Sequence, residues 1–348
     1  MKNKISQALA NLGFAFSEAA TTSVPSSEYA KLLVQAADDS FFKNPWFTLE
    51  NVIICYSSWA EALTEDKIVE FTSRYNVGQQ NKAAKTVGII AAGNIPLVGL
   101  HDILCCLISG HKALIKLSGR DADLTQLVIN ILEKMEPSLK GMVTIAEDRL
   151  TNFDAIIATG SNNSARYFEY YFAKYPHIIR KNRNGVALLT GLETKKELEQ
   201  LGNDIYQYFG LGCRNVSKLF VPKGYDFTPL FQALEPWNQL INHNKYANNY
   251  SYSRALWLID LVPHLDTGFM LVRPNESFAS PIATLYFEEY ENLDQIIAFL
   301  NQNIEQLQCV VSNVEKVPLK VNFGQTQQPE LWDFADGVDT MKFLENIN

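Results

Sequence analysis

Cysteine and histidine are scarce in this sequence of 348 residues, and their spacing does not suggest a metal site or a disulfide framework. The five cysteines are odd in number and form no CxxC pair, which argues against the cross-linked scaffold of a small secreted protein. The five histidines include no HExxH pair or similar arrangement. We therefore expect no bound metal.

Long hydrophobic runs are also missing. The most apolar segment, residues 86–117, is interrupted by Asn94, Pro96, His101 and Asp102, so no stretch of about 18 apolar residues could span a membrane. The first residues lack the continuous apolar core of a signal peptide. The net charge of -8 argues against nucleic acid as a partner. These absences predict a soluble, cytoplasmic protein with no membrane span.

What the sequence does contain is ordinary globular composition, 47% hydrophobic and 20% charged, with enough length for two domains. Residues 1–80 are predicted to be mostly helical, because apolar residues recur at helical spacing over 27–37 and 63–75. No internal repeat or low-complexity segment is present.

From residue 86 onward, short apolar runs alternate with helical patterns. Strands are predicted over 86–92, 113–117, 142–145 and 154–158, with helices over 98–109, 121–134 and 162–174. Such alternation is typical of a doubly wound sheet. The GxGxxG fingerprint of many dinucleotide-binding proteins is absent.

A second alternating stretch begins near residue 186. It contains predicted strands at 186–189, 218–222, 254–260, 268–273 and 283–287, and predicted helices at 195–209, 227–241 and 293–301. We therefore expect a helical segment and cofactor-binding domain over 1–185, and a catalytic domain over 186–325. Residues 326–348 would return to the first domain or join an oligomer interface. Without a Pro/Gly/Ser-rich linker, the domains should pack tightly.

The segment Gly210-Leu211-Gly212-Cys213 follows a predicted helix and precedes an apolar strand. Glycines permit a tight turn that presents the next side chain. A thiol in such a turn can be reached by a substrate and polarised by backbone N–H groups. Cys213 is therefore a candidate nucleophile; the alternative is a buried apolar cysteine, the commoner state of an intracellular cysteine.

Five short segments follow one another along the chain in an order that can be compared with known families. They are 93–97 (Gly-Asn-Ile-Pro-Leu), 115–118 (Ile-Lys-Leu-Ser), 158–161 (Ala-Thr-Gly-Ser), 210–213 and 276–281 (Glu-Ser-Phe-Ala-Ser-Pro). The series, which runs from about residue 86 to the C-terminus, resembles the aldehyde dehydrogenase superfamily. That resemblance implies an aldehyde dehydrogenase-like α/β fold with two doubly wound Rossmann-like domains.

Within the superfamily, residues 158–164, 213–218 and 333–340 are most similar to acyl-CoA reductases related to the bioluminescence long-chain fatty acid reductase. The resemblance implies reduction of a fatty acyl thioester to the aldehyde, with NADPH as hydride donor and NADH as the alternative. Cys213 would form the acyl-enzyme, and Asn94 would stabilise the oxyanion together with the Cys213 N–H. Asn94 could instead be a turn residue before Pro96.

The same resemblance assigns the adenosine ribose to Lys116 and Ser118. Arg120 follows closely, so two cations flank the place where a 2′-phosphate would lie. NAD-selective sites usually carry a carboxylate there. The sequence therefore favours NADPH. A solvated strand end is the plain alternative for Lys116 and Ser118.

Thr159, Gly160 and Ser161 would bring a helix N-terminus to the pyrophosphate, although Ser161 could simply cap that helix. Glu276 would bind the nicotinamide ribose, and Phe278 would pack near the nicotinamide ring. The alternatives are a surface carboxylate and a core aromatic, which are the commoner fates of these residue types.

Oxidative members of the superfamily carry a glutamate that activates water, but residues 179–185 contain no carboxylate. Its absence favours reduction, because a reductase must protect its acyl-enzyme from hydrolysis. Two alternatives stay open: reduction of another activated acid, an acyl phosphate or acyl adenylate, and a non-catalytic nucleotide- or acyl-binding protein with the same fold. The resemblance also implies a homodimer or a dimer-based tetramer, with interface strands near 322–348.

Overall fold

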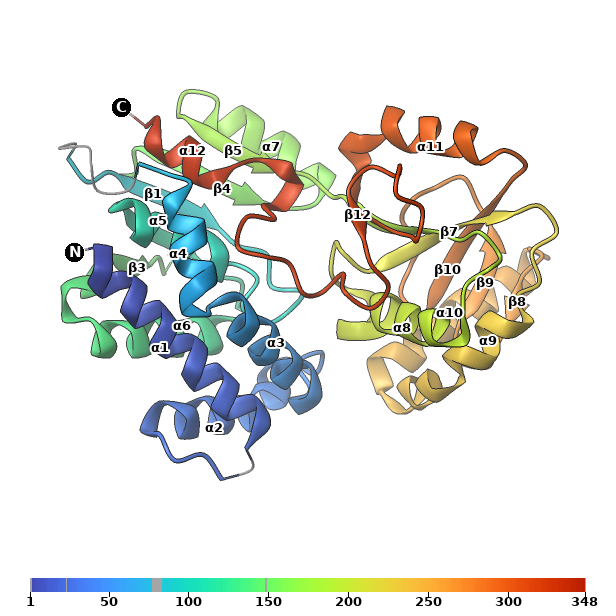
Figure 1. The fold of residues 1–348 in the computed structure, drawn as a ribbon, viewed down its shortest axis with the longest axis horizontal. Helices are drawn as coiled ribbons and strands as arrows, with labels where there is room; N and C mark the ends of the chain where they lie inside the picture. Colours follow the sequence, from blue (N-terminus) through green and yellow to red (C-terminus); the bar gives the residue numbers. More distant parts are fainter. Residues whose placement is uncertain (1, 23, 77–82, 120, 148, 348) are drawn as a thin grey trace. The chain divides into compact units, whose positions relative to one another are not determined.

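The computed structural model describes residues 2–22, 24–76, 83–119, 121–147 and 149–347 (Figure 1). The chain divides into two compact units. Unit 1 comprises Met1–Asn182 and Gln328–Asn348, and unit 2 comprises Arg183–Gln327. Each unit is built around a sheet of mostly parallel strands, which confirms the predicted α/β class.

Unit 1 begins with four helices, as the apolar periodicity predicts. They are α1 (Lys2–Thr21), α2 (Glu28–Lys43), α3 (Leu49–Ala62) and α4 (Glu65–Ser73). Ser27 and Thr48 cap α2 and α3, since each side-chain oxygen accepts a hydrogen bond from a first-turn N–H. Helix α1 packs against all three of the others through its buried apolar stripe.

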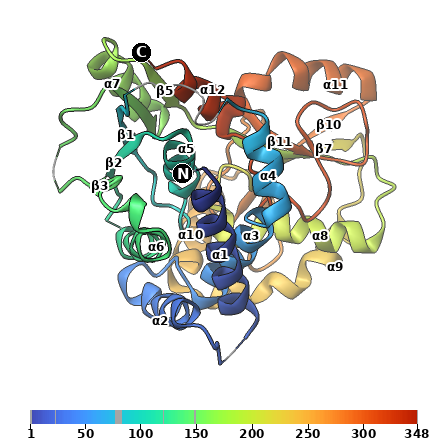
Figure 2. The same cartoon turned by 60° about the vertical axis from the view of Figure 1, so that its left-hand side comes forward.

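A five-stranded parallel sheet follows, in the order β3-β2-β1-β4-β5. Its elements are β1 (Thr86–Ile90), α5 (Leu100–Ser109), β2 (Lys112–Lys116), α6 (Ala122–Met135), β3 (Val143–Ile145), β4 (Ala155–Thr159), α7 (Asn162–Phe172) and β5 (His177–Arg180). Figure 2 shows α1 beside α5 and α6, which it contacts. The four predicted strands are present; β5, which is only four residues long, was not predicted.

The C-terminal segment belongs to unit 1 and is held there by a buried ion pair. Arg180, at the end of β5, donates to both carboxylate oxygens of Asp102 on α5, at 2.6 and 2.8 Å. The same guanidinium donates to Thr340 Oγ1 at 3.0 Å, where α12 (Thr340–Glu345) begins. Helix α12 also packs on α5. Over the described residues 322–347 the chain forms a 3-10 turn and this helix and no strand, so the predicted interface strands are wrong.

Unit 2 carries a seven-stranded sheet in the order β12-β11-β6-β7-β10-β9-β8, parallel except for the β8–β9 pair. Its elements are β6 (Asn184–Leu188), α8 (Lys195–Tyr206), β7 (Val216–Pro222), α9 (Thr228–Leu234), α10 (Asn244–Ile259), β8 (Leu265–Asp266), β9 (Leu271–Pro274), β10 (Thr284–Tyr290), α11 (Leu293–Gln302), β11 (Leu307–Val311) and β12 (Lys320–Val321). Helices α8 and α9 cover one face of the sheet and α11 covers the other (Figure 1).

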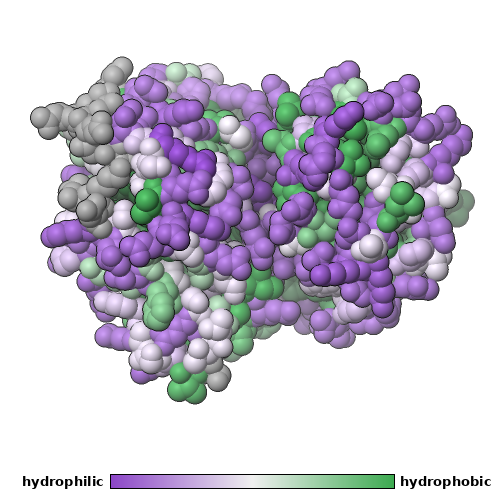
Figure 3. Space-filling model, viewed as in Figure 1, coloured by the Kyte–Doolittle hydropathy of each residue, from purple (hydrophilic) through white to green (hydrophobic). Residues whose placement is uncertain are grey.

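Two predictions for unit 2 need correction. A strand was predicted over 254–260, but residues 254–259 belong to helix α10 and Asp260 is its C-cap, because a short apolar run cannot by periodicity alone be told from a helix segment. The helix predicted over 195–209 ends at Tyr206. Among the described helices, none combines the length and apolarity needed to cross a membrane. Hydrophilic residues cover most of the face shown in Figure 3.

Candidate active site

The turn that carries Cys213 is reached through three consecutive residues in the left-handed backbone region. Tyr208, Phe209 and Gly210 have φ of 53°, 58° and 74°. This conformation costs about 1–2 kcal/mol for each residue other than glycine, and strain of this kind gathers at functional sites. It also explains why the predicted helix stops at Tyr206: the chain must reverse before it enters β7.

The buried side chain of Asn215 holds this turn in place. Its Nδ2 donates to the carbonyls of Asp204 and Gln207, at 3.1 and 2.9 Å, which lie at the C-terminal end of α8 where helix carbonyls lack partners. Its Oδ1 accepts from the Gly212 N–H at 2.8 Å. A Cβ at Gly212 would lie 2.9 Å from that oxygen, so the close approach requires glycine there. One amide group thus ties the turn before Cys213 to α8.

Cys213 is exposed, whereas the other four cysteines are buried. Burial raises the pKa of the Cys309 thiol to about 12 and raises the pKa values of Cys55, Cys105 and Cys106 well above the ordinary range. The interpretation of Cys213 as a buried apolar cysteine is therefore wrong. A reagent or substrate in solution can reach Cys213 far more readily than the other thiols.

Asn94 lies half-buried in the loop between β1 and α5, in unit 1. Asp121 holds the far end of this loop, since its carboxylate accepts from the Leu97 N–H at 3.2 Å and from Thr125 Oγ1 at 3.1 Å. Leu97 itself has φ of 54°. Burial raises the pKa of Asp121 to about 7. Asp121 takes the N-cap position of α6, but its carboxylate holds the Asn94 loop and makes no cap hydrogen bond.

Lys116 and Ser118 lie at the carboxyl end of β2, next to the end of β1, where Ile90 is in register with Lys116. Lys116 Nζ donates to the Glu147 carbonyl at 3.0 Å. The turn after Ser118 is closed by a hydrogen bond from the Asp121 N–H to the Ser118 carbonyl. Arg120, the second cation of the predicted phosphate site, lies outside the described residues.

Thr159 ends β4, and Gly160 and Ser161 lead into α7. Ser161 caps α7 by accepting from the Ser164 N–H at 3.2 Å, as the plain interpretation of Ser161 predicts. A Cβ at Gly160 would lie 2.8 Å from Ser164 Cβ, so glycine allows the helix to start close against the strand end. The N-terminus of α7 therefore opens at the edge of the sheet, with the partial positive charge of its N–H groups.

This edge of unit 1 suits a dinucleotide. Strands β1 and β4 are neighbours that lead to α5 and α7, and ligands of open α/β sheets bind outside the carboxyl ends of strands at such a point. The groups gathered there are an ammonium at Lys116, a hydroxyl at Ser118 and a helix N-terminus after Ser161. All are donors that match an anionic pyrophosphate and ribose hydroxyls.

In unit 2, Glu276 and Phe278 lie in the loop between β9 and β10. The Glu276 side chain is exposed. Phe278 is 7% exposed, with its ring 6.3 Å from that of Phe220 and 6.0 Å from that of Phe299. Its position matches the core-aromatic alternative, and contact with a nicotinamide ring stays a prediction.

The structure thus gathers the predicted residues into two sets. Unit 1 holds Asn94, Lys116, Ser118, Thr159, Gly160 and Ser161 along one sheet edge, and unit 2 holds Cys213, Glu276 and Phe278 around the start of β7. No three acidic, histidine or cysteine side chains of the described chain are grouped to hold a metal. No role is predicted from the sequence for Asn215 and Lys218, although both lie in the segment 213–218 that carries the resemblance. A lysine within the apolar run of β7 is the signal that could have indicated a role for Lys218.

The comparisons with known proteins identify the fold. No protein-family model and no curated protein matches the chain. Aldehyde dehydrogenase 21 of Physcomitrella patens is similar in structure, with a TM-score of 0.62 and 10% identity over 97% of this chain and 84% of its own.

Two further solved structures agree. The indole-3-acetaldehyde dehydrogenase AldA of P. syringae has a TM-score of 0.60 and 14% identity, over 90% of this chain and 75% of its own. The propionaldehyde dehydrogenase of a Clostridium phytofermentans microcompartment has a TM-score of 0.58 and 10% identity, over 91% of this chain and 80% of its own. This protein therefore has the aldehyde dehydrogenase-like fold.

Proposed function

We propose that this protein is an acyl-CoA reductase that converts a fatty acyl thioester to the aldehyde through an acyl-enzyme on Cys213. The observation that carries the proposal is the exposed thiol of Cys213 on a turn fixed by Asn215, among cysteines that are otherwise buried. A propionaldehyde dehydrogenase and an indole-3-acetaldehyde dehydrogenase share the fold, which supports aldehyde-related redox chemistry.

The first step is acyl transfer to the enzyme. The Cys213 thiolate attacks the acyl carbonyl, the bond to the coenzyme A sulfur breaks, and coenzyme A leaves as a thiolate that takes up a proton. Asn94 Nδ2 and the Cys213 N–H would donate to the oxyanion while it forms. Removal of one such donor typically raises the barrier by about 3 kcal/mol.

The second step reduces the acyl group. When bound, the nicotinamide cofactor would supply the hydride for the acyl carbonyl carbon. Lys116, Ser118 and the N-terminus of α7 would hold its adenosine ribose and pyrophosphate, and Glu276 would hold the nicotinamide ribose. The resulting thiohemiacetal then breaks its carbon–sulfur bond, which frees the aldehyde and restores the Cys213 thiolate.

Hydrolysis of the acyl-enzyme would need a general base, and the segment where oxidative relatives place one has none. Two carboxylates contact this segment: Glu169 pairs with Lys181 at 2.7 Å, and both oxygens of Asp102 accept from the Arg180 guanidinium. A buried carboxylate engaged on both oxygens is a poor base for water. This argues for reduction over oxidation.

NADPH is the proposed cofactor, because Lys116 and Arg120 would supply positive charge near the expected 2′-phosphate, and the neighbouring Asp121 carboxylate is engaged by the Leu97 N–H and Thr125 Oγ1. One similar solved structure is in complex with NAD+, which supports a nicotinamide cofactor of either kind. Titration with NADPH and NADH separates the two. Tighter binding of NADH would overturn the preference, and unchanged selectivity in Arg120→Glu would exclude Arg120 as its source.

The experiment for the reaction is acylation without a reductant. Incubation with a long-chain acyl-CoA should release free coenzyme A and add the acyl mass to the Cys213 peptide, and NADPH should then release the aldehyde. Acylation only by an acyl phosphate or acyl adenylate would change the substrate class. Cofactor binding without any acylation would instead indicate a non-catalytic binding protein.

We also propose a cytoplasmic homodimer or dimer-based tetramer, on the family resemblance alone. Light scattering at micromolar concentration tests the oligomer. A pure monomer would contradict it.

A further inference from the structure

Lys218 is a charged side chain in the interior of unit 2. It lies in β7 and has no exposed surface, and it shares its face of the sheet with the apolar cluster under α11. Burial of an ammonium is costly unless its hydrogen bonds are satisfied, and an apolar residue of similar volume often serves stability as well or better. Its contacts therefore indicate what it does.

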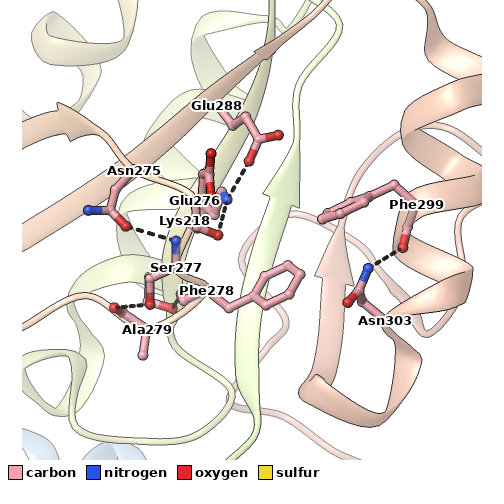
Figure 4. A network of polar contacts seen from close by, with 10 residues as sticks. Lys218, Asn275, Glu276, Ser277, Phe278, Ala279, Glu288, Phe299 and Asn303 are labelled. Atoms are coloured by element: carbon pink, nitrogen blue, oxygen red, sulfur yellow. Dashed lines mark hydrogen bonds and ion pairs between the residues drawn. The ribbon is translucent and has the colours of Figure 1, made fainter.

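The ammonium of Lys218 binds two oxygens (Figure 4) and also lies near two aromatic rings. Nζ donates to the Glu276 backbone carbonyl at 2.8 Å and to Glu288 Oε2 at 2.6 Å. It also lies 4.8 Å from the ring centre of Phe220 and 5.3 Å from that of Phe278, within cation–π range. Two of these four partners, Glu276 and Phe278, belong to the loop between β9 and β10.

Ser217, the preceding residue, holds the same loop from the other side of the strand. Its Oγ lies 2.7 Å from the Phe278 carbonyl, to which it donates. Two successive residues of β7 thus bind the carbonyls of Glu276 and Phe278. Within the loop, Asn275 Oδ1 accepts from the Ser277 N–H at 2.8 Å (Figure 4). The conformation of the loop is therefore set largely by β7.

The same strand is joined to the Cys213 turn. Asn215, which locks that turn, directly precedes Val216, the first residue of β7. One short stretch, residues 215–218, therefore binds both the turn with the thiol and the loop with Glu276. A shift of either segment against the other would require β7 to move within the sheet, where it pairs with β6 and β10.

We propose that Lys218 is a positioning residue, which fixes the Glu276–Phe278 loop relative to Cys213 so that a cofactor ribose bound at Glu276 is held at a set distance from the thiol. This inference rests on the proposed function. In this proposal Lys218 contacts neither substrate nor cofactor. Lys218 acts on the loop through its contacts with the Glu276 carbonyl and the Phe278 ring.

The test compares Lys218→Met with wild type in the full chain, using three measurements. Amide hydrogen exchange of the peptide covering residues 275–280, without cofactor, should become faster. The Kd for NADPH should rise by about tenfold to a hundredfold, as expected for loss of a charge-assisted hydrogen bond. Alkylation of Cys213 by iodoacetamide should keep its wild-type rate, because the Asn215 contacts are untouched.

Lys223→Met is the matched control. Lys223 follows the same strand and pairs with Glu291 at 2.5 Å, but both side chains are mostly exposed, so its loss should leave all three measurements unchanged. Glu288→Gln should weaken cofactor binding less than Lys218→Met, because it spares the bond to the Glu276 carbonyl. If Lys218→Met does not fold, Ser217→Ala tests the same loop through the Phe278 carbonyl.

Unchanged exchange and unchanged Kd in a folded Lys218→Met protein would overturn the positioning role. A wild-type protein that binds neither NADPH nor NADH would overturn the proposed function. It would also overturn the positioning role of Lys218, even if hydrogen exchange showed that Lys218 stabilises the loop. The two failures are thus distinguished by the wild-type titration.

Discussion

The two units build their proposed functional edges in different ways. In unit 1, Lys116, Ser118 and Ser161 lie at strand ends and at a helix N-terminus, where Ser161 caps α7 through a local hydrogen bond. In unit 2, the Cys213 turn is held by the buried amide of Asn215, and the Glu276 loop by the buried ammonium of Lys218. The Cys213 turn and the Glu276 loop of unit 2 thus rely on buried side chains, whereas the N-terminus of α7 in unit 1 is held by a local cap.

The largest expected effect tests whether unit 2 carries the chemistry. Cys213→Ala should reduce aldehyde formation by about 10⁴-fold or more, since no other thiol is accessible, while NADPH binding stays close to wild type. Coupled turnover and a cofactor titration measure the two properties. A variant that retained substantial turnover would remove Cys213 from the mechanism.

The buried ion pair of unit 1 offers the strongest test of stability. Asp102→Asn leaves the Arg180 guanidinium buried without its carboxylate, and should lower the free energy of unfolding by about 3–5 kcal/mol. Urea unfolding followed by fluorescence measures the loss. The double variant Asp102→Leu with Arg180→Met should recover much of it; equal losses in both variants would mean that the hydrogen bond to Thr340 matters more than the charge pair.

Substitution of Asn94 tests whether a residue of unit 1 stabilises the oxyanion in the transition state. Asn94→Ala should lower kcat by roughly 100-fold to 1,000-fold with little change in KM, because an oxyanion donor acts in the transition state. Steady-state kinetics with acyl-CoA provide both constants. A change confined to KM would instead assign Asn94 to the turn that leads to Pro96.

Substitution of Asn215 compares a turn that is held by a buried side chain with a helix end that is held by a local cap. Asn215→Ala leaves the Gly212 N–H and the α8 carbonyls without their partner, and should destabilise the protein by about 1–3 kcal/mol. The loosened turn should also change the rate at which iodoacetamide labels Cys213. Ser161→Ala, which removes a local cap in unit 1, is the matched comparison and should leave that rate unchanged.

Each unit also contains a buried carboxylate that resists ionisation, and the smallest expected effect concerns these groups. Burial raises the pKa of Asp204 in unit 2 to about 6 and that of Asp121 in unit 1 to about 7. The folded state then binds these protons more tightly than the unfolded chain does. Their contribution to stability is complete below about pH 4 and is lost as the pH rises through the folded pKa.

The measurement is the pH dependence of urea unfolding. Asp204→Asn should remove a decline of about 1 kcal/mol between pH 5 and pH 6, and Asp121→Asn should act at higher pH. Identical pH profiles for the wild type and both variants would show that neither carboxyl holds its proton in the folded state.

Much of this architecture follows from sequence patterns, and its limits have a physical cause. Apolar runs at residues 86, 113 and 155 predict three strands of unit 1 because buried parallel strands need continuous apolar residues. The exposed position of Cys213 agrees with its glycine-rich turn. The strand predicted from the apolar run at 254–260 was wrong, since short apolar segments of helices and strands have the same pattern. The contacts of Asn215, Arg180 and Lys218 were not predicted, because their partners lie in loops or far along the chain, where no periodicity operates.

The path of the chain has a consequence for biosynthesis. Unit 2 is continuous, but unit 1 is interrupted at Asn182 and resumes at Gln328. A ribosome therefore delivers all of unit 2 before it delivers Thr340, the hydroxyl partner of Arg180. Unit 2 can therefore finish folding before unit 1, because α5 of unit 1 is covered only after α12 has been synthesised. A nascent chain stalled after Gln327 would display a finished unit 2 beside an α5 surface still open to chaperones.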